Sequence, residues 1–171
     1  DVSGSMQSPA TGFRKGATTS VRCIDVAGLV AAAMLRSNPE TIVLPFENQV
    51  VDIRLNGRDS VMTNAKRLAN IGGGGTNCSA PLVWLNKHKT AVDVVIFVSD
   101  NESWLDNRRQ GASETMKQWA EVKRRNPQAK LVCMDIQPNT TTQAAEREDI
   151  LNIGGFSDEV FKLVGLLANN E

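Results

Sequence analysis

The fold class follows from one segment of the chain, Ala91-Val-Asp-Val-Val-Ile-Phe-Val98. The segment is rich in β-branched residues and apolar on both faces, which is typical of a strand buried on both sides within a parallel sheet. Lys130-Leu-Val-Cys-Met-Asp-Ile136 has the same character and predicts a second buried strand. Helical patterns alternate with these strands, so we expect an open, mostly parallel α/β sheet flanked by helices on both faces.

Apolar spacing and capping residues predict the helices. The first runs from Ser20 to Ser37, where Asn38-Pro39 ends it. The remaining helices are expected at residues 60–70, 79–88, 113–125 and 157–167. Two further strands are expected at residues 41–46 and 50–55, joined by a turn, and Ile150 to Ile153 is expected to form a short apolar turn.

Length and charge limit the class of protein. The chain has 171 residues, the size of one domain, and 41% of them are hydrophobic. Nineteen Lys and Arg balance 19 Asp and Glu, so net charge alone would not hold the domain to nucleic acid, and DNA is not an expected partner. The longest apolar run, Val26 to Leu35, is too short to span a bilayer, so no membrane partner is expected.

The cysteines and the start of the chain bear on location and completeness. Cys23, Cys78 and Cys133 are odd in number, far apart and without zinc-binding spacing, which favours reduced thiols in a cytoplasmic protein. No basic-then-apolar leader opens the chain. Asp1 has the character of a residue that follows a buried strand. We therefore expect residues 1–171 to be the larger part of one domain from a longer protein, without its first central strand.

Three segments place oxygen-bearing side chains at the expected ends of strands. Asp1-Val-Ser-Gly-Ser5 alternates a carboxylate with two hydroxyls, and alternate residues of an extended chain point the same way. Gly72-Gly-Gly-Gly75 lets a loop approach closely and present the Thr76 hydroxyl. Asp100 follows the 91–98 strand at its carboxyl end, which is the edge where open α/β sheets bind ligands.

Together these residues predict a site for a hard divalent cation. Two carboxylates and three hydroxyls, from Asp1, Ser3, Ser5, Thr76 and Asp100, offer only oxygen ligands. Such a set favours Mg²⁺, with Mn²⁺ or Ca²⁺ as alternatives, and water or an oxygen from a partner would complete the coordination. Taken singly, each segment is ordinary, since a DxSxS string is more often a turn with a capping serine.

The same segments resemble a known family. Asp1-Val-Ser-Gly-Ser-Met6, Thr76 and Asp100 match the metal-ion-dependent adhesion site (MIDAS) of von Willebrand factor A (vWA) domains. The similarity is closer to the vWA domain of Ro autoantigen (TROVE) proteins. It extends over Gly74-Gly-Thr-Asn-Cys-Ser79, Ser99-Asp-Asn-Glu-Ser103 and Gly154-Gly-Phe156, so that it spans nearly the whole chain.

The resemblance implies a Rossmann-like vWA fold, with the five oxygen-bearing residues as direct or water-mediated metal ligands. It also implies a longer, non-catalytic component of a cytoplasmic ribonucleoprotein, in which this domain closes a ring of helical repeats. That ring would bind small noncoding Y RNA and the ends of misfolded RNA in RNA quality control. A protein partner could offer a carboxylate to the metal.

In that family an apolar strand leads into the residue that matches Asp1 and lies in the middle of the sheet. Without it, the 92–98 strand would lose a central neighbour, and roughly five or six backbone hydrogen bonds would go unmade. We therefore expect residues 1–171 alone to be poorly stable. A cooperative melt typical of mesophilic domains would contradict this.

Two other functions fit parts of the pattern. A Mg²⁺-dependent phosphoryl-transfer enzyme of the haloacid-dehalogenase type also carries an Asp after its first strand. Its acid/base Asp two residues later is Ser3 here, which cannot perform the same proton transfer. No clearly placed Lys completes such a site, and Gly72 to Gly75 lack the Gly-Lys-Ser/Thr of a P-loop. An extracellular vWA adhesion module would carry the same metal site, and the unpaired cysteines speak against it.

Several basic and aromatic residues have two interpretations. His88, within Asn86-Lys-His-Lys89, lies at a predicted helix end, where cations suit the helix dipole, and no nucleophile motif gives it a catalytic role. Lys123-Arg-Arg125 and Arg108-Arg109 either contact phosphate or form solvated helix ends, and zero net charge favours the second. Trp84 and Trp119 have apolar neighbours at helical spacing and are predicted to be core residues.

Overall fold

The computed structural model describes residues 1–12, 19–100, 110–137, 148–155 and 162, with the backbone alone at 110–113. The helix expected at 157–167, apart from Lys162, lies outside these residues, as does Arg108-Arg109. The contacts divide the chain into two compact units, Asp1–Pro81 and Leu82–Glu171. None of the described helices is long and apolar enough to cross a membrane.

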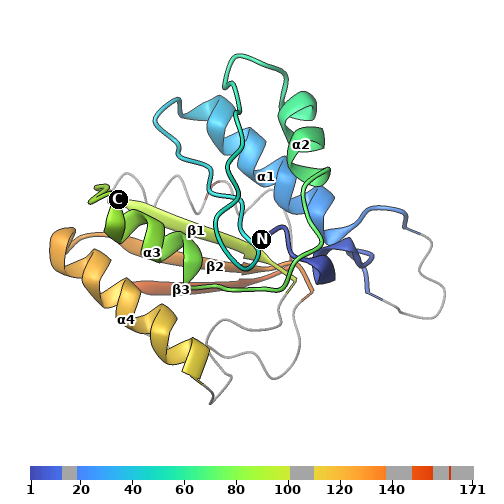
Figure 1. Cartoon of the computed structure of the whole chain (residues 1–171). Coiled ribbons are helices and arrows are strands. Elements are labelled where there is room, and N and C mark those ends of the chain that lie inside the picture. The colour runs from blue at the N-terminus through green and yellow to red at the C-terminus, as the bar shows by residue number, and fades with distance from the viewer. Residues whose placement is uncertain (13–18, 101–109, 138–147, 156–161, 163–171) are drawn as a thin grey trace. The chain divides into compact units, whose positions relative to one another are not determined.

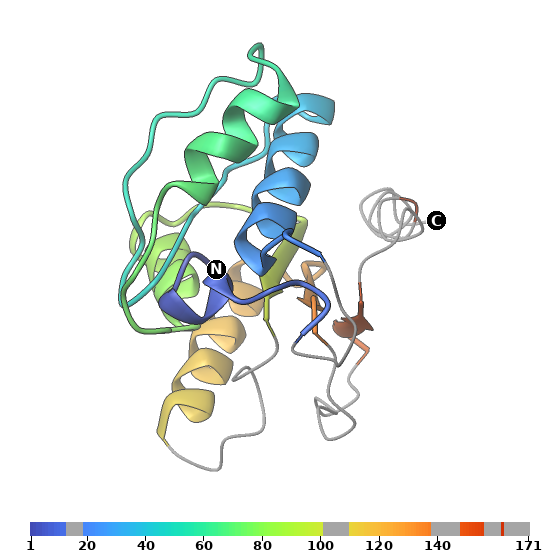
Figure 2. The ribbon, with the colours of Figure 1, turned by 90° about the vertical axis from the view of Figure 1, so that its right-hand side faces the viewer.

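The first unit is built on two packed helices, α1 (Cys23–Ser37) and α2 (Val61–Ala69), which lie side by side in Figures 1 and 2. They confirm the helices predicted at 20–37 and 60–70. A capping box starts α1, because Asp25 accepts hydrogen bonds from the Arg22 backbone N–H at 2.9 Å and from its guanidinium at 2.7 Å. At Gly28 a Cβ atom would lie 2.9 Å from the Ala65 carbonyl oxygen, so the close approach of the helices requires glycine.

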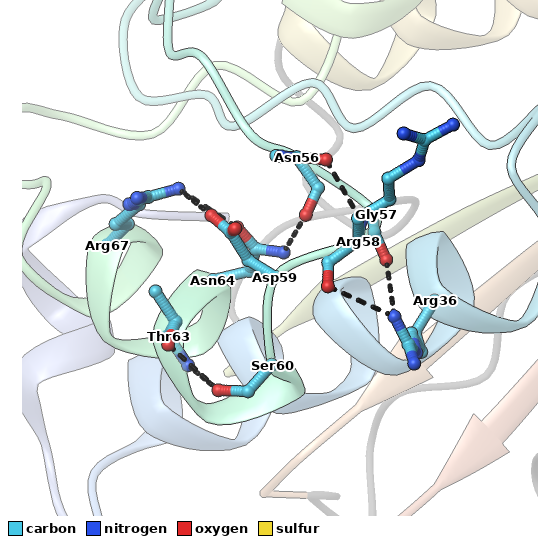
Figure 3. A network of polar contacts seen from close by, with 9 residues as sticks. All are labelled: Arg36, Asn56, Gly57, Arg58, Asp59, Ser60, Thr63, Asn64 and Arg67. Atoms are coloured by element: carbon cyan, nitrogen blue, oxygen red, sulfur yellow. Dashed lines mark hydrogen bonds and ion pairs between the residues drawn. The ribbon is translucent and has the colours of Figure 1, made fainter.

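A polar network ties α2 to the loop before it and to the end of α1. The buried Asn64 amide donates to the Asn56 carbonyl at 2.7 Å, and the Ser60 hydroxyl caps the helix by accepting from the Thr63 N–H. The Arg36 guanidinium reaches from α1 to two carbonyls of the loop, at 3.3 and 3.2 Å. Figure 3 shows the members of the network: Arg36, Asn56, Gly57, Arg58, Asp59, Ser60, Thr63, Asn64 and Arg67.

The strands predicted at residues 41–46 and 50–55 are wrong. The chain turns at residues 47–49 as expected, but the two segments share a single antiparallel bridge, between Phe46 and Val50. A strand needs a ladder of hydrogen bonds to a neighbour. Among the described residues the Phe46 carbonyl accepts from the Val2 N–H and the Pro45 carbonyl from the Val51 N–H, and these single bonds do not extend into a ladder. Half-buried and exposed residues alternate over 51–55 because one side of this segment faces the protein interior, although the segment belongs to no sheet.

The second unit contains a parallel sheet in the order β1 (Val94–Ser99), β2 (Lys130–Asp135), β3 (Ile150–Gly154). The first two strands confirm the two predicted buried strands. The third corrects the prediction of a turn at Ile150 to Ile153. Only its first residue is buried and Asn152 is exposed, so the segment lacks the continuous apolar character by which the other strands were recognised.

Two helices cover one face of this sheet, α3 (Ala80–Lys87) and α4 (Gln110–Arg125) (Figure 1). They confirm the helices predicted at 79–88 and 113–125. Trp119 of α4 is fully buried, as predicted, and its Nε1 donates to Asp149 at 2.8 Å. Trp84 of α3 differs from the prediction of a core residue, because it is half-buried and stacks on His88. The three cysteines are buried and free.

Candidate metal centre

The segment from Asp1 to Ser5 forms a tight loop in the first unit. Asp1 Oδ1 accepts a hydrogen bond from the Ser3 backbone N–H at 2.8 Å, and Ser3 is fully buried. Beyond Ser3 the chain enters a 3-10 helix, η1 (Gly4–Gln7). The expectation of one extended segment is therefore wrong after Ser3. A helical turn, and not strand alternation, carries Ser5 back toward Ser3.

The two serine hydroxyls of this loop lie close together. Ser3 Oγ and Ser5 Oγ share a hydrogen bond of 3.3 Å, in which either hydroxyl can be the donor. Ser3 occupies the N-cap position of η1, yet its side chain makes no capping hydrogen bond. Capping is the ordinary use of a serine at such a position. The Ser3 hydroxyl is bonded to the Ser5 hydroxyl and not to the helix backbone, which differs from the plain cap that a DxSxS string usually forms.

The glycine run packs against this loop, backbone to backbone. The Gly4 N–H donates to the Gly74 carbonyl at 2.9 Å. Gly72 has φ +131°, and a Cβ atom on it would lie 2.6 Å from the Val2 carbonyl oxygen. Only glycine fits so close an approach in that conformation. Thr76 is exposed, two residues beyond Gly74, so the segment that carries it is held against the Asp1–Ser5 loop.

Glu47 is a positioning residue that the sequence did not reveal. Its Oε2 accepts from the Gly74 N–H at 2.8 Å, and its backbone carbonyl accepts from the Asn77 N–H at 2.8 Å. Asn77 also donates through Nδ2 to the Asn48 carbonyl at 3.1 Å. The turn at 47–48 therefore holds both ends of the segment that contains Thr76. The only signal in the sequence was a Glu within a predicted turn, which is too common to single out.

Asp100 belongs to the second unit, directly after β1. It is 8% exposed and follows the buried Ser99. The strand register places Ser99 beside Asp135, so two buried carboxylates lie at the ends of neighbouring strands. Asp135 was not singled out because its position within an apolar segment suggested only a strand residue. Asp100 lies in the second unit, whereas the other four predicted ligands lie in the first. Its role as a metal ligand therefore stays a prediction.

The loop in the first unit fits a small divalent cation. Octahedral Mg²⁺ holds oxygens at about 2.0–2.1 Å, which places neighbouring ligands about 3 Å apart. The serine hydroxyls are 3.3 Å apart, close to that spacing. Among the described residues no three His, Cys, Asp or Glu side chains form a cluster that could hold a metal. What the loop offers is hydroxyl and carboxylate oxygen, the hard ligands that Mg²⁺ and Mn²⁺ accept.

Comparisons with known proteins agree with the resemblance seen in the motifs. The sequence model of the Ro60 vWA domain matches residues 1–167. The chain is 26% identical over 164 residues to the RNA-binding protein RO60 of Deinococcus radiodurans, an alignment that covers 89% of this chain and 30% of that protein.

A solved structure shares the fold. The crystal structure of the Deinococcus radiodurans Ro (RSR) protein aligns with a TM-score of 0.71 at 21% identity, covering 99% of this chain and 33% of that one. The parallel sheet and its helices therefore form a Rossmann-like α/β fold of the vWA type, as the sequence predicted. This chain spans about a third of the length of these relatives.

Proposed function

This chain belongs to the family of Ro60 vWA domains, and on that basis we propose that it is the non-catalytic, divalent-cation-binding domain of an RNA-binding Ro protein. Its metal ligands, direct or through water, are Asp1, Ser3, Ser5, Thr76 and Asp100. The preferred ion is Mg²⁺, with Mn²⁺ and Ca²⁺ as substitutes. The observation that carries the proposal is the buried Ser3 hydroxyl, which does not cap η1 and lies 3.3 Å from Ser5 Oγ.

Each part of the centre has its own task. Asp1 brings negative charge to the loop and also fixes it, through the hydrogen bond that it accepts from the Ser3 N–H. Glu47 and the glycine run position the segment of Thr76 against that loop. A bound cation would bring positive charge to the loop, and a carboxylate from a protein partner would be a suitable further ligand for it.

The RNA part of the proposal is supported by family membership and by the relatives. The similar protein of Deinococcus radiodurans, of whose length this chain covers 30%, is named an RNA-binding protein. We assign Y RNA and misfolded RNA to the remaining parts of the protein, and to this domain the closing of the ring of helical repeats. Cytoplasmic RNA quality control is the process in which we place it.

Ser3 also bears on the alternative of a phosphoryl-transfer enzyme. In the haloacid-dehalogenase arrangement, a carboxylic acid at this position exchanges a proton with the leaving group, and a serine hydroxyl does not titrate in the range that such a role needs. A phosphatase assay with Mg²⁺ and p-nitrophenyl phosphate separates the two functions. The proposal predicts no turnover above that of an Asp1→Asn variant.

A thermal melt with Mg²⁺ and Mn²⁺ tests the metal centre on the native polypeptide that contains these residues. At a metal concentration about 100 times the dissociation constant, binding stabilises the folded state by about 2.7 kcal/mol, or about 5–10 °C for a domain of this size. Asp1→Asn keeps a side-chain oxygen for the Ser3 N–H and removes the charge. It should therefore lose the metal response while its metal-free melting temperature changes little.

The matched control is Asp52→Asn, which neutralises an exposed carboxylate of the same unit and should retain the full response. Two results would contradict the proposal. One is the absence of a metal response in the unmodified protein. The other is an equal response in the unmodified protein and in Asp1→Asn.

A further inference from the structure

Basic side chains are concentrated at one edge of the sheet in the second unit. It is the edge at which the strands begin. Because α4 follows β1 and returns before β2, its last residues lie at the edge where β2 begins (Figure 1). The last residues of α3 lie at the same edge, since a short link joins them to the start of β1. We name this set the amino-edge cluster: Lys87, His88, Lys89, Lys123, Arg124, Arg125 and Lys130.

Direct contacts tie the end of α3 to α4. Asn86 Nδ2 donates to the Gln118 carbonyl at 3.0 Å. Arg125 Nη2 donates to the Leu85 carbonyl at 3.5 Å. The amino-edge cluster is therefore one patch of the surface and not a set of separate helix ends.

Part of the amino-edge cluster is used within the fold. Lys123 Nζ donates to two carbonyls that follow α4, and the two arginines form ion pairs with Glu121. Cations at a helix end interact favourably with the helix dipole, and this accounts for these three residues. Lys87 and Lys89 are exposed, and their ammonium groups have no partner among the described residues.

Lys89 occupies a position that usually takes glycine. Its φ is +52°, the left-handed conformation that ends many helices. The Thr90 N–H donates to the Leu85 carbonyl at 3.1 Å, and the Lys89 N–H donates to the Asn86 carbonyl at 3.2 Å, which is the hydrogen-bond pattern of a Schellman motif. Glycine would adopt this conformation at no steric cost. The fold alone therefore gives no reason for a lysine at this position.

His88 presents an aromatic ring between the two lysines. It stacks on Trp84, with ring centroids 3.9 Å apart and an interplanar angle of 22°. Its Nδ1 lies 2.8 Å from the Trp84 carbonyl oxygen, which fixes the imidazole in place. His88 is exposed while Trp84 is half-buried, so the indole supports the imidazole from the inner side. A fixed aromatic ring with a lysine before and after it in the sequence offers a stacking surface for a base and cations for its phosphates.

We propose that the amino-edge cluster binds single-stranded RNA, with a base stacked on His88 and phosphates bound by Lys87 and Lys89. This inference rests on the proposed function, because it adds an RNA contact to a domain of an RNA-binding protein. Six Lys and Arg lie at this edge together with four carboxylates, those of Asp93, Glu121, Glu148 and Asp149. The local charge is therefore 6 − 4 = +2, in a chain without net charge. An acidic protein segment would use the lysines but would leave the stacked ring without a role.

Salt-dependent RNA binding tests the two lysines. Fluorescence anisotropy would follow a labelled oligouridine of about ten nucleotides, at salt concentrations from about 50 to about 200 mM, on the native polypeptide that contains this chain. Lys87→Gln combined with Lys89→Gly should reduce the slope of log affinity against log salt by about 1.4, which is 2 × 0.7 for two single-strand phosphate contacts. Binding should weaken because the two positive charges are lost. The melting temperature should not fall, because glycine adopts the left-handed conformation of position 89 without strain.

The control removes the same charge from the first unit, with Arg58→Gln and Lys66→Gln. Both residues are exposed, and the Arg58 guanidinium points away from the surrounding network in Figure 3. This variant should leave the salt slope unchanged. A slope that falls equally in both double variants, or in neither, would overturn the inference.

His88→Ala tests the stacked ring. Loss of one stacked base should weaken binding about fivefold or more, with the salt slope retained. Photocrosslinking with 4-thiouridine RNA should label the peptide that contains Trp84 to Lys89. RNA binding without that crosslink, and with unaltered affinity in His88→Ala, would overturn the inference while leaving the proposed function intact. If the unmodified protein binds no single-stranded RNA, the RNA part of the proposed function fails as well.

Discussion

Replacing Gly72 by Ala should weaken the metal centre, whereas the same change at Gly73 should not. Both glycines have positive φ angles, +131° and +121°. A Cβ atom at Gly72 would meet the Val2 carbonyl oxygen at 2.6 Å, and a Cβ atom at Gly73 would meet nothing within 4 Å. The pair of variants therefore separates backbone strain from displacement of the loop that carries Asp1, Ser3 and Ser5.

The structure gives the size of the effect at Gly72. Alanine at either glycine costs about 1–3 kcal/mol of stability through backbone strain. At Gly72 the distance between the new Cβ atom and the Val2 carbonyl oxygen must also grow by about 0.8 Å, from 2.6 Å to an ordinary contact of 3.4 Å. Because that oxygen belongs to the backbone, the backbone itself has to move. Overpacking of this kind adds about 1–3 kcal/mol. The displaced segment lies between Asp1 and Ser3, and loss of support for metal ligands lowers affinity about 10–100-fold.

Isothermal titration with Mn²⁺ would measure this difference, with circular dichroism to establish that both variants are folded. We expect a dissociation constant about 10–100-fold higher for Gly72→Ala and an unchanged one for Gly73→Ala. Equal weakening in both variants would refute the reasoning, because strain alone would then explain the loss. Unchanged affinity in Gly72→Ala would show that the Val2 contact does not hold the metal loop in place.

Three further predictions concern stability. The hydrogen bond from Arg22 lowers the pKa of the Asp25 carboxyl. The contribution of the ionised Asp25 carboxylate to stability is therefore complete above its pKa in the unfolded chain, about 3.9, and is lost as the pH falls through its lower pKa in the folded protein. Asp25→Asn should flatten the acid dependence of the melting temperature over that pH range. Trp119→Phe removes the donor to Asp149 at a fully buried position and should lower the free energy of urea unfolding by about 1–3 kcal/mol. Asn64→Ala removes the donor to the loop before α2 and should cost a similar amount, with faster amide exchange in that helix. Unchanged unfolding of either buried variant would contradict the role given to its hydrogen bond.

Sequence periodicity predicts the elements that are determined by local pattern. The apolar faces of α1 and the continuous apolar runs of β1 and β2 are examples. Residues 41–46 and 50–55 show where this fails, because a pattern compatible with a strand does not show whether a neighbouring strand is present. The five residues of β3 were missed for the opposite reason, since they are recognised as a strand only once they pair with β2.

The candidate site shows the same division between local and distant information. The spacing of Asp1, Ser3 and Ser5 predicted that their oxygens would converge, although a 3-10 turn and not an extended chain brings the two serines together. Glu47 was beyond prediction because its hydrogen bond to Gly74 joins residues 27 positions apart. A local pattern carries no information about such a contact.

Anomalous diffraction from Mn²⁺-soaked crystals of the native polypeptide would test the metal assignment most directly. We predict a Mn²⁺ peak bonded to the hydroxyl oxygens of Ser3 and Ser5, with Asp1, Thr76 and Asp100 bound to the ion directly or through ordered water. At saturating Mn²⁺, a loop with no peak beside those two hydroxyls, or a peak held by other residues, would contradict the assignment of this domain as a cation-binding vWA domain.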